Sequence, residues 1–243
     1  MKAEINTRQE NTAADLYKVN CEYCGGAGYV HPVENGRIQY DRTIPCICRK
    51  SESEKRIRRY LLDSCDLPPG TDDMDFKSFK VLPEVKTAFN IAKEMADKPG
   101  ELRWITFMGV NGTGKTHLAI SICKAWLNAG IPAKYAFVPL LLDELREGFN
   151  RQNGENYQKR FDYYCNVPLL ILDDLGAESS TAWVQEKLET IVDYRMFHKL
   201  SLIITSNNAL EQFSNRIRSR LPRLKESVIV NVGKEDFNLK AMP

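Results

Sequence analysis

From residue 83 onward, short apolar segments alternate with amphipathic ones, and this pattern predicts strands separated by helices. In the first amphipathic segment, residues 84–97, the apolar side chains Val85, Ala88, Phe89 and Ala92 recur at the i, i+3, i+4 and i+7 positions of one helix face. The predicted strands are residues 104–108, 133–138, 168–172, 201–205 and 227–232. The predicted helices are residues 84–97, 115–128, 140–149, 155–165, 182–198 and 209–220. Strands that alternate with helices pair in parallel and are covered on both faces, so the expected class is α/β.

The first third of the chain lacks this alternation. Ser51-Glu52-Ser53-Glu54 has the pattern of a capping box, which predicts the start of a basic helix that runs to about Leu62. The stretch after it contains Pro68-Pro69-Gly70 and several aspartates, a composition typical of a linker. The predicted parts are an N-terminal module at 1–65, a linker at 66–82 and an α/β domain at 83–243.

Composition limits the class of protein. The chain has 243 residues, of which 43% are hydrophobic and 27% are charged, so it can build a core and is not disordered throughout. Its apolar runs are far shorter than the roughly 20 residues that span a bilayer. Residues 1–20 are polar and have no apolar centre, so they do not resemble a secretory signal. We therefore expect a cytoplasmic protein without a membrane partner.

Charge adds little at the level of the whole chain but is uneven along it. The net charge is 34 − 32 = +2, which by itself predicts neither a nucleic-acid nor a membrane partner. Basic side chains gather in residues 49–59 and again in residues 216–225. Each run is either a binding surface or a solvated face.

Four of the seven cysteines are clustered in the N-terminal module. They form a C-x2-C pair and a C-x-C pair at Cys21, Cys24, Cys46 and Cys48. In a chain without a leader, two such knuckles favour a tetrahedral Zn²⁺ site made of four thiolates over a disulfide framework. Four unligated thiols, a redox dithiol, an iron–sulfur cluster, and His31 in place of one ligand remain alternatives. The other three cysteines, Cys65, Cys123 and Cys165, are isolated and are predicted to be ordinary buried side chains.

The strongest motif follows the first predicted strand of the α/β domain. Residues 109–116 read Gly-Val-Asn-Gly-Thr-Gly-Lys-Thr, the G-x4-G-K-T phosphate loop in its strand–loop–helix context. Glycines let backbone N–H groups converge on phosphate oxygens, and the helix N-terminus adds a favourable dipole. The Lys115 side chain should reach the β- and γ-phosphates, and the Thr116 hydroxyl should bind Mg²⁺. The predicted nucleotide-binding residues are Gly109, Asn111, Gly112, Thr113, Gly114, Lys115, Thr116 and His117.

Two later strands end in polar residues that suit hydrolysis. The apolar run 169–172 leads into Asp173 and Asp174. At the carboxyl end of a strand, Asp173 can hold Mg²⁺ through water and Asp174 can orient or deprotonate the attacking water. Glu178 is a rival for the second role. The strand at 201–205 leads into Ser206-Asn207-Asn208, where a polar side chain can position the lytic water.

The basic run that follows offers cations for the transition state. Arg216 and Arg220 could stabilise its charge, in cis or across a subunit interface. The alternative is that Arg216, Arg218 and Arg220 form a phosphate-binding strip for DNA.

Taken together, these motifs resemble the bacterial and phage helicase loaders of the DnaC/DnaI type, within the AAA+ ATPases. The resemblance covers nearly the whole chain, and its most discriminating parts are Leu-Asp-Asp-Leu-Gly and Thr-Ser-Asn. Its segments are the cysteine module, Leu67-Pro68 to Phe79, Gly109–Thr116, Leu172–Gly176, Tyr194-Arg195, Thr205–Asn207 and Ser219–Leu221. The resemblance implies an AAA+ five-stranded parallel sheet flanked by helices, without a C-terminal lid, preceded by a small zinc-binding domain.

The resemblance also implies roles and partners. Asn207 would be sensor 1, and Arg220 the finger that reaches the ATP of a neighbouring copy, so the ATPase domain would self-associate. The zinc module would grip the hexameric replicative helicase while the ATPase domain contacts single-stranded DNA. Two departures matter: Asp174 stands where most AAA+ proteins carry Glu, which predicts slow turnover, and 233–238 lacks the sensor 2 arginine. Lys234 or Lys240 is a candidate substitute.

The expected function is ATP-dependent loading of the hexameric replicative helicase onto single-stranded DNA, with ATP/ADP, Mg²⁺ and Zn²⁺ as cofactors. A transposition helper ATPase of the IstB type shares the core motifs but generally lacks the metal module. A P-loop small-molecule kinase is a third alternative. It would need an acceptor pocket and an arginine-rich lid, neither of which is evident in residues 139–167.

Overall fold

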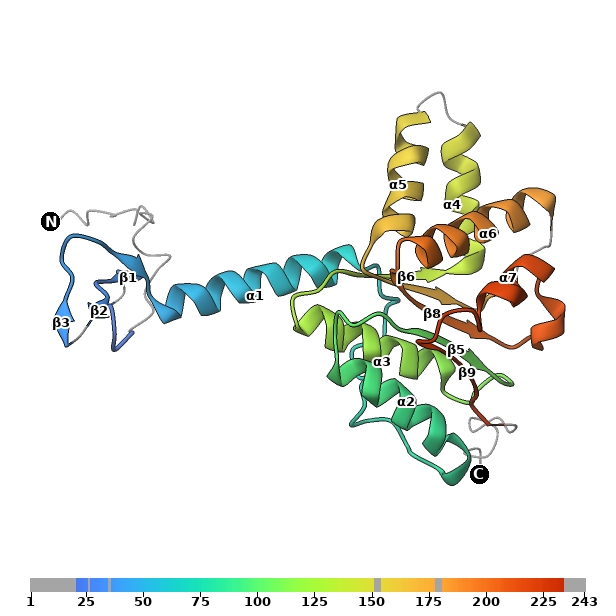
Figure 1. The fold of residues 1–243 in the computed structure, drawn as a ribbon, viewed down its shortest axis with the longest axis horizontal. Coiled ribbons are helices and arrows are strands. Elements are labelled where there is room, and N and C mark those ends of the chain that lie inside the picture. Colours follow the sequence, from blue (N-terminus) through green and yellow to red (C-terminus); the bar gives the residue numbers. More distant parts are fainter. Residues whose placement is uncertain (1–20, 26, 35, 151–153, 178–180, 234–243) are drawn as a thin grey trace, which may run out of the picture. The chain divides into compact units, whose positions relative to one another are not determined.

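The computed structural model describes residues 21–25, 27–34, 36–150, 154–177 and 181–233 of the chain (Figure 1). The chain divides into two compact units, residues 1–57 and 58–243. The division falls inside helix α1 (Ile47–Ser64), a few residues before the boundary that we expected at residue 65. No described helix is long and apolar enough to cross a membrane.

The N-terminal unit contains two small antiparallel ladders and the start of α1. Strand β1 (Tyr29–Val30) pairs with β4 (Ile44–Pro45), and β2 (Val33–Glu34) pairs with β3 (Arg37–Ile38). Helix α1 begins directly after Cys46, so the capping box predicted at residues 51–54 lies inside the helix, and that predicted start was wrong. The second cysteine pair therefore spans the start of the helix, with Cys46 just before it and Cys48 in its first turn.

The C-terminal unit is built on a parallel sheet with the strand order β6-β7-β8-β5-β9. The sheet confirms the five predicted strands to within two residues at each end. Their bounds are β5 Trp104–Met108, β6 Ala133–Phe137, β7 Leu169–Asp173, β8 Ser201–Ser206 and β9 Ser227–Asn231. Every strand of this sheet points the same way, so all five carboxyl ends lie along one edge.

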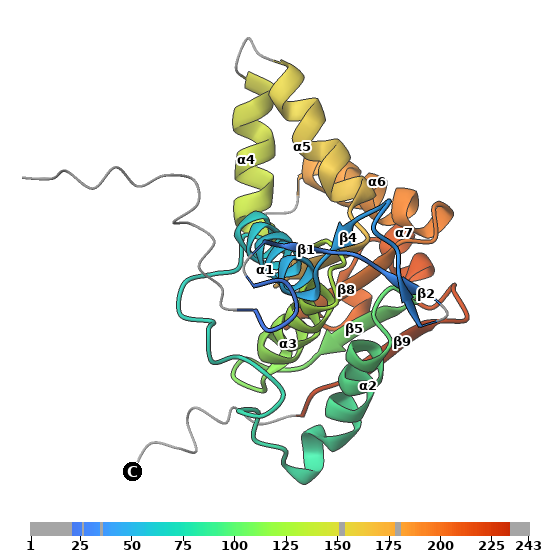
Figure 2. The ribbon, with the colours of Figure 1, turned by 90° about the vertical axis from the view of Figure 1, so that its left-hand side faces the viewer.

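Helices cover both faces of the sheet, α2 and α3 on one side and α4 to α7 on the other (Figures 1 and 2). Their bounds are α2 Lys86–Asp97, α3 Lys115–Asn128, α4 Val138–Asn150, α5 Gly154–Asn166, α6 Ala182–Phe197 and α7 Asn215–Arg220. A 3-10 turn, Pro83–Val85, leads into α2. Alternate side chains of β7 serve the two faces: Leu169 and Ile171 join one apolar cluster, and Leu170 and Leu172 join the other. Continuous apolar strands are thus explained by burial on both faces.

The helix predicted at 209–220 is interrupted, and that prediction was wrong in its first half. A 3-10 turn occupies Leu210–Gln212, and Phe213 is extended. Ser214 then caps α7, because its hydroxyl accepts a hydrogen bond from the Ile217 N–H at 3.3 Å. The polar pattern at 209–214 resembled a helix turn, but this local cap starts the helix six residues later.

The segment at 66–82, which we expected to be a linker, packs against the C-terminal unit. It has turns in place of helices or strands, yet its apolar side chains lie half-buried on the core. These side chains are Leu67, Met74, Phe76, Phe79 and Leu82. The segment therefore forms part of this unit.

Arg195 fastens α6 to the sheet from inside the core. Its side chain is fully buried, and its terminal nitrogens donate to main-chain oxygens of Tyr164, Cys165, Val167, Pro168 and Ser201. Burial lowers the pKa of Arg195 to about 9. Arg195 thus links the segment that precedes β7 to the first residue of β8.

Candidate functional site

The phosphate loop connects β5 to α3 and depends on its glycines. Gly109, Gly112 and Gly114 have φ of +146°, +72° and +91°, values that L side chains rarely adopt. A Cβ at Gly114 would also lie 2.7 Å from the ring of Phe79. Gly114 directly precedes α3, whose first N–H groups have no partner within the helix and can bind phosphate oxygens.

Lys115 lies at the first position of α3 with its ammonium turned back on the loop. Its Nζ donates to the carbonyl oxygens of Gly109 and Val110 at 2.8 and 2.7 Å. The side chain of Thr113 donates to the same Val110 carbonyl at 3.0 Å, which fixes the turn. Lys115 itself is buried, so its charge is held in the loop before any ligand is considered.

Asp173, the last residue of β7, accepts hydrogen bonds from three hydroxyl groups. Its Oδ1 accepts from Thr116 at 2.9 Å and from Thr205 at 2.7 Å, and its Oδ2 accepts from the Tyr135 hydroxyl at 2.6 Å. Burial, with the Asp173 charge beside it, raises the pKa of Tyr135. Tyr135 therefore stays a donor that orients the carboxylate. The structure brings together Thr116 and Asp173, the two predicted Mg²⁺ ligands.

Asp174 follows β7 in a backbone conformation with φ of +58°, uncommon for a residue other than glycine. Its N–H donates to Thr205 Oγ1 at 2.9 Å, and its Oδ1 accepts from Asn207 Nδ2 at 2.6 Å. Burial and the neighbouring Asp173 charge raise the pKa of Asp174, and Lys115 opposes them. The predicted base and the predicted sensor thus lie in direct contact, at the ends of adjacent strands.

These residues surround one pocket of about 370 Å³ at the carboxyl edge of the sheet. Three lining residues were not predicted as site residues: Met74 from the 66–82 segment, Phe137 at the end of β6, and Thr205 near the end of β8. Met74 and Phe137 supply apolar walls beside the polar phosphate loop. Met74 stands in a stretch without a periodic pattern, and the pattern around Phe137 predicts a strand but not a pocket wall. The predicted residues lining the pocket are Asn111, Gly112, Gly114, Lys115, Thr116, His117, Asp173, Asp174 and Asn207.

His117 lies at the edge of this pocket and binds the 66–82 segment. Its Nε2 donates to the carbonyl oxygen of Asp75 at 2.8 Å, and its ring meets that of Phe79 edge to face. Two turns later, Lys124 donates to the carbonyl oxygens of Thr71 and Asp72. One face of the phosphate-binding helix therefore fixes the segment that contributes Met74.

Neither predicted arginine lies in the pocket. Arg220 and Arg216 both bind the carboxylate of Asp193 on α6, with Nε–oxygen distances of 2.6 and 2.7 Å. Their contact with a phosphate stays a prediction. Glu178, Lys234 and Lys240 lie outside the described residues, so the rival base and the sensor 2 substitutes stay predictions too.

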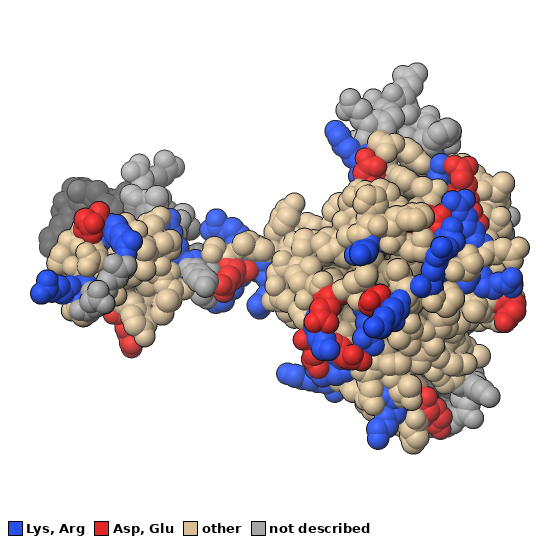
Figure 3. Space-filling view, viewed as in Figure 1, with Lys and Arg blue, Asp and Glu red and all other residues tan. Residues whose placement is uncertain are grey.

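The two basic runs differ in their surroundings. On α1, the side chains at 55, 56, 58 and 59 are exposed, and Arg49 lies over the Tyr29 ring at 4.3 Å. Figure 3 shows acidic side chains interspersed with basic ones on the face in view. In the run at 216–225, two of the five basic residues, Arg216 and Arg220, share the single carboxylate of Asp193.

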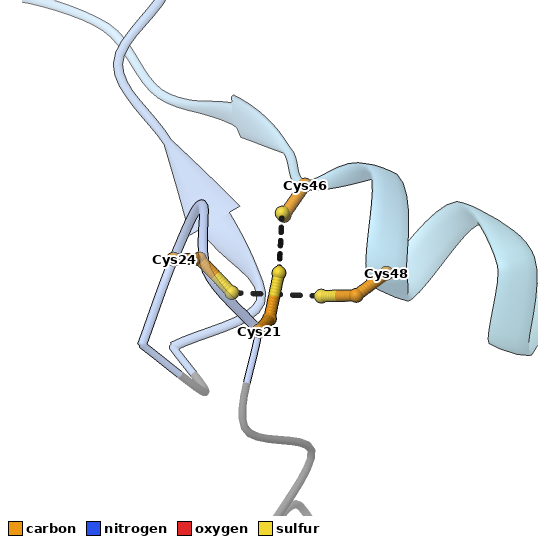
Figure 4. Close-up of side chains that lie close together, drawn as sticks. All are labelled: Cys21, Cys24, Cys46 and Cys48. Atoms are coloured by element: carbon orange, nitrogen blue, oxygen red, sulfur yellow. Dashed lines mark hydrogen bonds between the residues drawn. The ribbon is translucent and has the colours of Figure 1, made fainter.

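The four clustered cysteines converge in the N-terminal unit (Figure 4). Cys21 and Cys24 come from the turn before β1, and Cys46 and Cys48 flank the start of α1. The Sγ–Sγ distances are 3.7 Å for Cys21–Cys46 and 3.5 Å for Cys24–Cys48, and all four sulfurs lie within 4.8 Å of one another. A zinc tetrahedron with bonds of about 2.3 Å has edges of about 3.8 Å. The thiol set and its spacing therefore fit Zn²⁺.

The surroundings of the sulfurs agree with a cation among them. The hydrogen bond with Cys24 and burial together raise the pKa of Cys48 to about 12. A metal cation among the sulfurs would favour their thiolate forms instead. The Gly28 N–H donates to Cys24 Sγ at 3.2 Å, as a support for a thiolate ligand would. His31 is not among the cluster residues, and its Nδ1 donates to the Arg42 carbonyl.

The remaining cysteines are buried, as predicted. Cys65, at the end of the α1 region, has its Sγ 3.3 Å from that of Cys123 on α3. Cys165 is buried near the start of β7.

Comparison with known proteins agrees with this architecture. Residues 72–225 match the family model described as IstB-like ATP binding protein. The chain is 24% identical over 225 residues to the replicative helicase loader DnaI of Bacillus subtilis (strain 168), covering 86% of this chain and 71% of that protein. It is 24% identical over 155 residues to the replicative helicase loader DnaC of Escherichia coli (strain K12), covering 63% of each.

Solved structures confirm the predicted AAA+ fold. A crystal structure of the DnaC helicase loader superposes with a TM-score of 0.61 at 22% identity, covering 68% of this chain and 100% of that one. A structure of the replication initiator DnaA bound to AMPPCP and single-stranded DNA gives 0.61 at 21% identity, with coverage of 70% and 52%. At these identities the likeness establishes the fold alone.

Proposed function

Because this chain belongs to the family of IstB-like ATP binding proteins, we propose that it uses ATP to load a hexameric replicative DNA helicase onto single-stranded DNA. The observation that carries the ATP-dependent part is the contact between Thr116 and Asp173 beneath the phosphate loop. It joins a hydroxyl and a carboxylate, the hard oxygen ligands that Mg²⁺ prefers, at the mouth of a phosphate cradle. The loader part rests on the similarity to the two curated loaders and on the cysteine cluster.

When ATP binds, the Lys115 ammonium leaves the neutral carbonyls of Gly109 and Val110 and donates to phosphate oxygens, because a charged acceptor binds an ammonium more strongly. The Thr116 hydroxyl and the Asp173 carboxylate are the groups that would hold Mg²⁺. Mg²⁺ held there would neutralise negative charge on the phosphates of ATP. Tyr135 and Thr205 keep the Asp173 carboxylate in one orientation throughout.

Hydrolysis is assigned to Asp174 and Asn207. The raised pKa of Asp174 makes its carboxylate a stronger base for the attacking water. Asn207 donates to that carboxylate and so limits its rotation. The aspartate is one methylene shorter than the glutamate of most AAA+ proteins, which is consistent with slow turnover.

The helicase contact is assigned to the N-terminal unit. This small unit exposes many large apolar side chains, which is typical of a surface that binds another protein. The exposed apolar side chains are Tyr23, Tyr29, Val33, Ile38, Tyr40, Ile44 and Ile47. Single-stranded DNA is assigned to the C-terminal unit, where the exposed Arg218, Arg223 and Lys225 can bind phosphates.

A transposition helper ATPase is the second candidate, because the matched family model carries the IstB name. The two proposals differ in the partner. A loader binds a helicase through the cysteine unit, whereas a helper ATPase acts on a transposase and has no need of that unit.

A loading assay tests the proposal. The purified chain, a replicative helicase of the same organism and circular single-stranded DNA are mixed with ATP, and helicase retained on the circles is measured. We expect loading by the parent chain and by Lys93→Ala, an exposed lysine paired with Asp97, but not by Lys115→Ala. No capture of the helicase, together with stimulation of a transposase, would replace this proposal by the second one.

A further inference from the structure

Helix α7 is held to α6 by two carboxylates one turn apart. Asp193 binds Arg220 and Arg216, and Glu189 accepts from the Ser214 hydroxyl at 2.7 Å. The Asp193 side chain is only 10% exposed and that of Arg220 19%, whereas the Arg216 side chain is 57% exposed, so only the Arg220 contact is largely shielded from solvent. Ile217 and Leu221 fix the same helix from its apolar side.

The two arginines use Asp193 differently. Arg216 approaches with Nε and Nη2, at 2.7 and 2.5 Å, and its Nη1 lies 3.8 Å from Glu189. Arg220 approaches with Nε alone, at 2.6 Å, and within the described part of the chain no partner is found for its two terminal nitrogens. All three guanidinium nitrogens of Arg216 therefore face carboxylates of α6. The two terminal nitrogens of Arg220 remain available to bind two oxygens of one phosphate.

We propose that Asp193 is a positioning residue, which holds Arg220 by Nε so that its two terminal nitrogens are presented to the γ-phosphate bound by a second copy of this chain. Arg216 instead secures α7. This inference rests on the proposed ATP-dependent function and deepens it, because it adds Asp193, a residue that the sequence did not single out, to the role that the resemblance implies for Arg220.

The chemistry favours this division of labour. A free arginine side chain samples many rotamers, and fixing one N–H in advance reduces the ordering cost when a phosphate is bound. Burial by itself would raise the pKa of Asp193, but the hydrogen bonds from Arg220 and Arg216 outweigh it and lower that pKa. The carboxylate therefore stays charged at neutral pH and keeps its hold on Arg220.

The test compares Asp193→Asn with Arg220→Ala, and uses Glu189→Gln as the matched control on the same face of α6. Asparagine keeps the volume but removes the charge that two guanidinium groups share. We expect Asp193→Asn to lower kcat for ATP hydrolysis at least tenfold. The Kd for ATP should not change, because the substitution leaves the ATP pocket of the variant chain intact. Glu189→Gln should lower the melting temperature without lowering kcat.

Mixing experiments locate the defect. A Lys115→Ala chain binds no ATP but has an intact Arg220, whereas an Arg220→Ala chain binds ATP. An equal mixture of the two should regain activity at interfaces where the first chain supplies Arg220 and the second supplies ATP. The same mixture with Asp193→Asn should regain activity to a similar extent. Loss of α7 as a whole would instead lower the melting temperature of Asp193→Asn well below that of Glu189→Gln and prevent this rescue.

The outcomes distinguish the action of Arg220 between copies from the positioning role of Asp193. If Arg220→Ala is not rescued, Arg220 does not act between copies and this inference fails, whereas the proposed function is decided separately by the loading assay. If Arg220→Ala is rescued but Asp193→Asn keeps the parent kcat, or loses it without rescue, the assignment of Asp193 is overturned while the proposed function stands.

Discussion

The two units of the chain are built on different physical bases. Between residues 21 and 57, Cys46 is the one buried side chain among the residues described, and the strands are two residues long. The C-terminal unit has two apolar clusters on either side of a five-stranded sheet. A segment of about 40 residues buries too little apolar surface to fold unaided and usually needs a metal or disulfides. We therefore expect that one chain combines a unit stabilised by its core with a unit that depends on a metal held by four sulfurs.

The difference extends to the functional groups. In the C-terminal unit, Asp173 and Asp174 are fixed by strands and hydrogen-bonded hydroxyls, so the pocket is preorganised by the fold. In the N-terminal unit, we expect the cysteines that define the site to hold the unit together as well. A change in one unit should therefore leave the other unit intact.

The largest effect is expected from Lys115→Ala. Lys115 offers two charge-assisted hydrogen bonds to phosphate, so its loss should weaken ATP binding by about 10³-fold. The zinc content should not change. Calorimetric titration with ATP and elemental analysis check both points, with Lys93→Ala as the control. A fall in zinc content with Lys115→Ala would show that the two units depend on each other.

Asp174→Asn should retain ATP but slow hydrolysis by about 10²-fold, because general base catalysis is lost while the phosphate cradle is spared. In the parent chain the carboxylate is the active form and its pKa is raised. The rate should therefore fall, as the pH is lowered, at a pH above the ordinary Asp value of 3.8. Steady-state rates against pH measure this, and Asp97→Asn, on the exposed face of α2, should behave as the parent does. Parent-like hydrolysis by Asp174→Asn, with loss in Glu178→Gln, would mean that Glu178 is the base.

Arg195→Met should lower the free energy of unfolding of the C-terminal unit by about 3 kcal/mol, because several buried carbonyl groups lose their donor. Arg160→Met removes an exposed arginine that pairs with Glu144 and should change stability by about 0.5 kcal/mol or less. Urea denaturation followed by tryptophan fluorescence reports this unit, which contains Trp104 and Trp126. Equal destabilisation by the two variants would contradict the structural role of Arg195.

The sequence predicted the strands and the phosphate loop well because each is a local pattern. Buried parallel strands are continuous apolar runs, and the loop has a fixed spacing of glycines. Within each cysteine pair the metal-ligand spacing is local too, and it predicted a shared site although Cys21 and Cys46 are 25 residues apart.

What the sequence could not supply are contacts between segments far apart. Tyr135 on β6 reaches Asp173 only because β6 and β7 are neighbours in the sheet. Met74 and Phe79 stand in an aperiodic stretch rich in turn residues, which indicates turns but not the surface on which they pack. The partner of Arg220 is Asp193, 27 residues earlier, in a helix whose own pattern indicates only burial.

The most direct test of the central difference is hydrogen exchange of the full chain before and after removal of zinc by a chelator. We predict one zinc per chain, and loss of backbone protection across residues 21–48 when it is removed. Protection of β5, β7 and β8 should stay as it was. Unchanged protection of residues 21–48 after chelation, or purified protein without zinc, would contradict the claim that the sulfur cluster holds the N-terminal unit together by binding a metal.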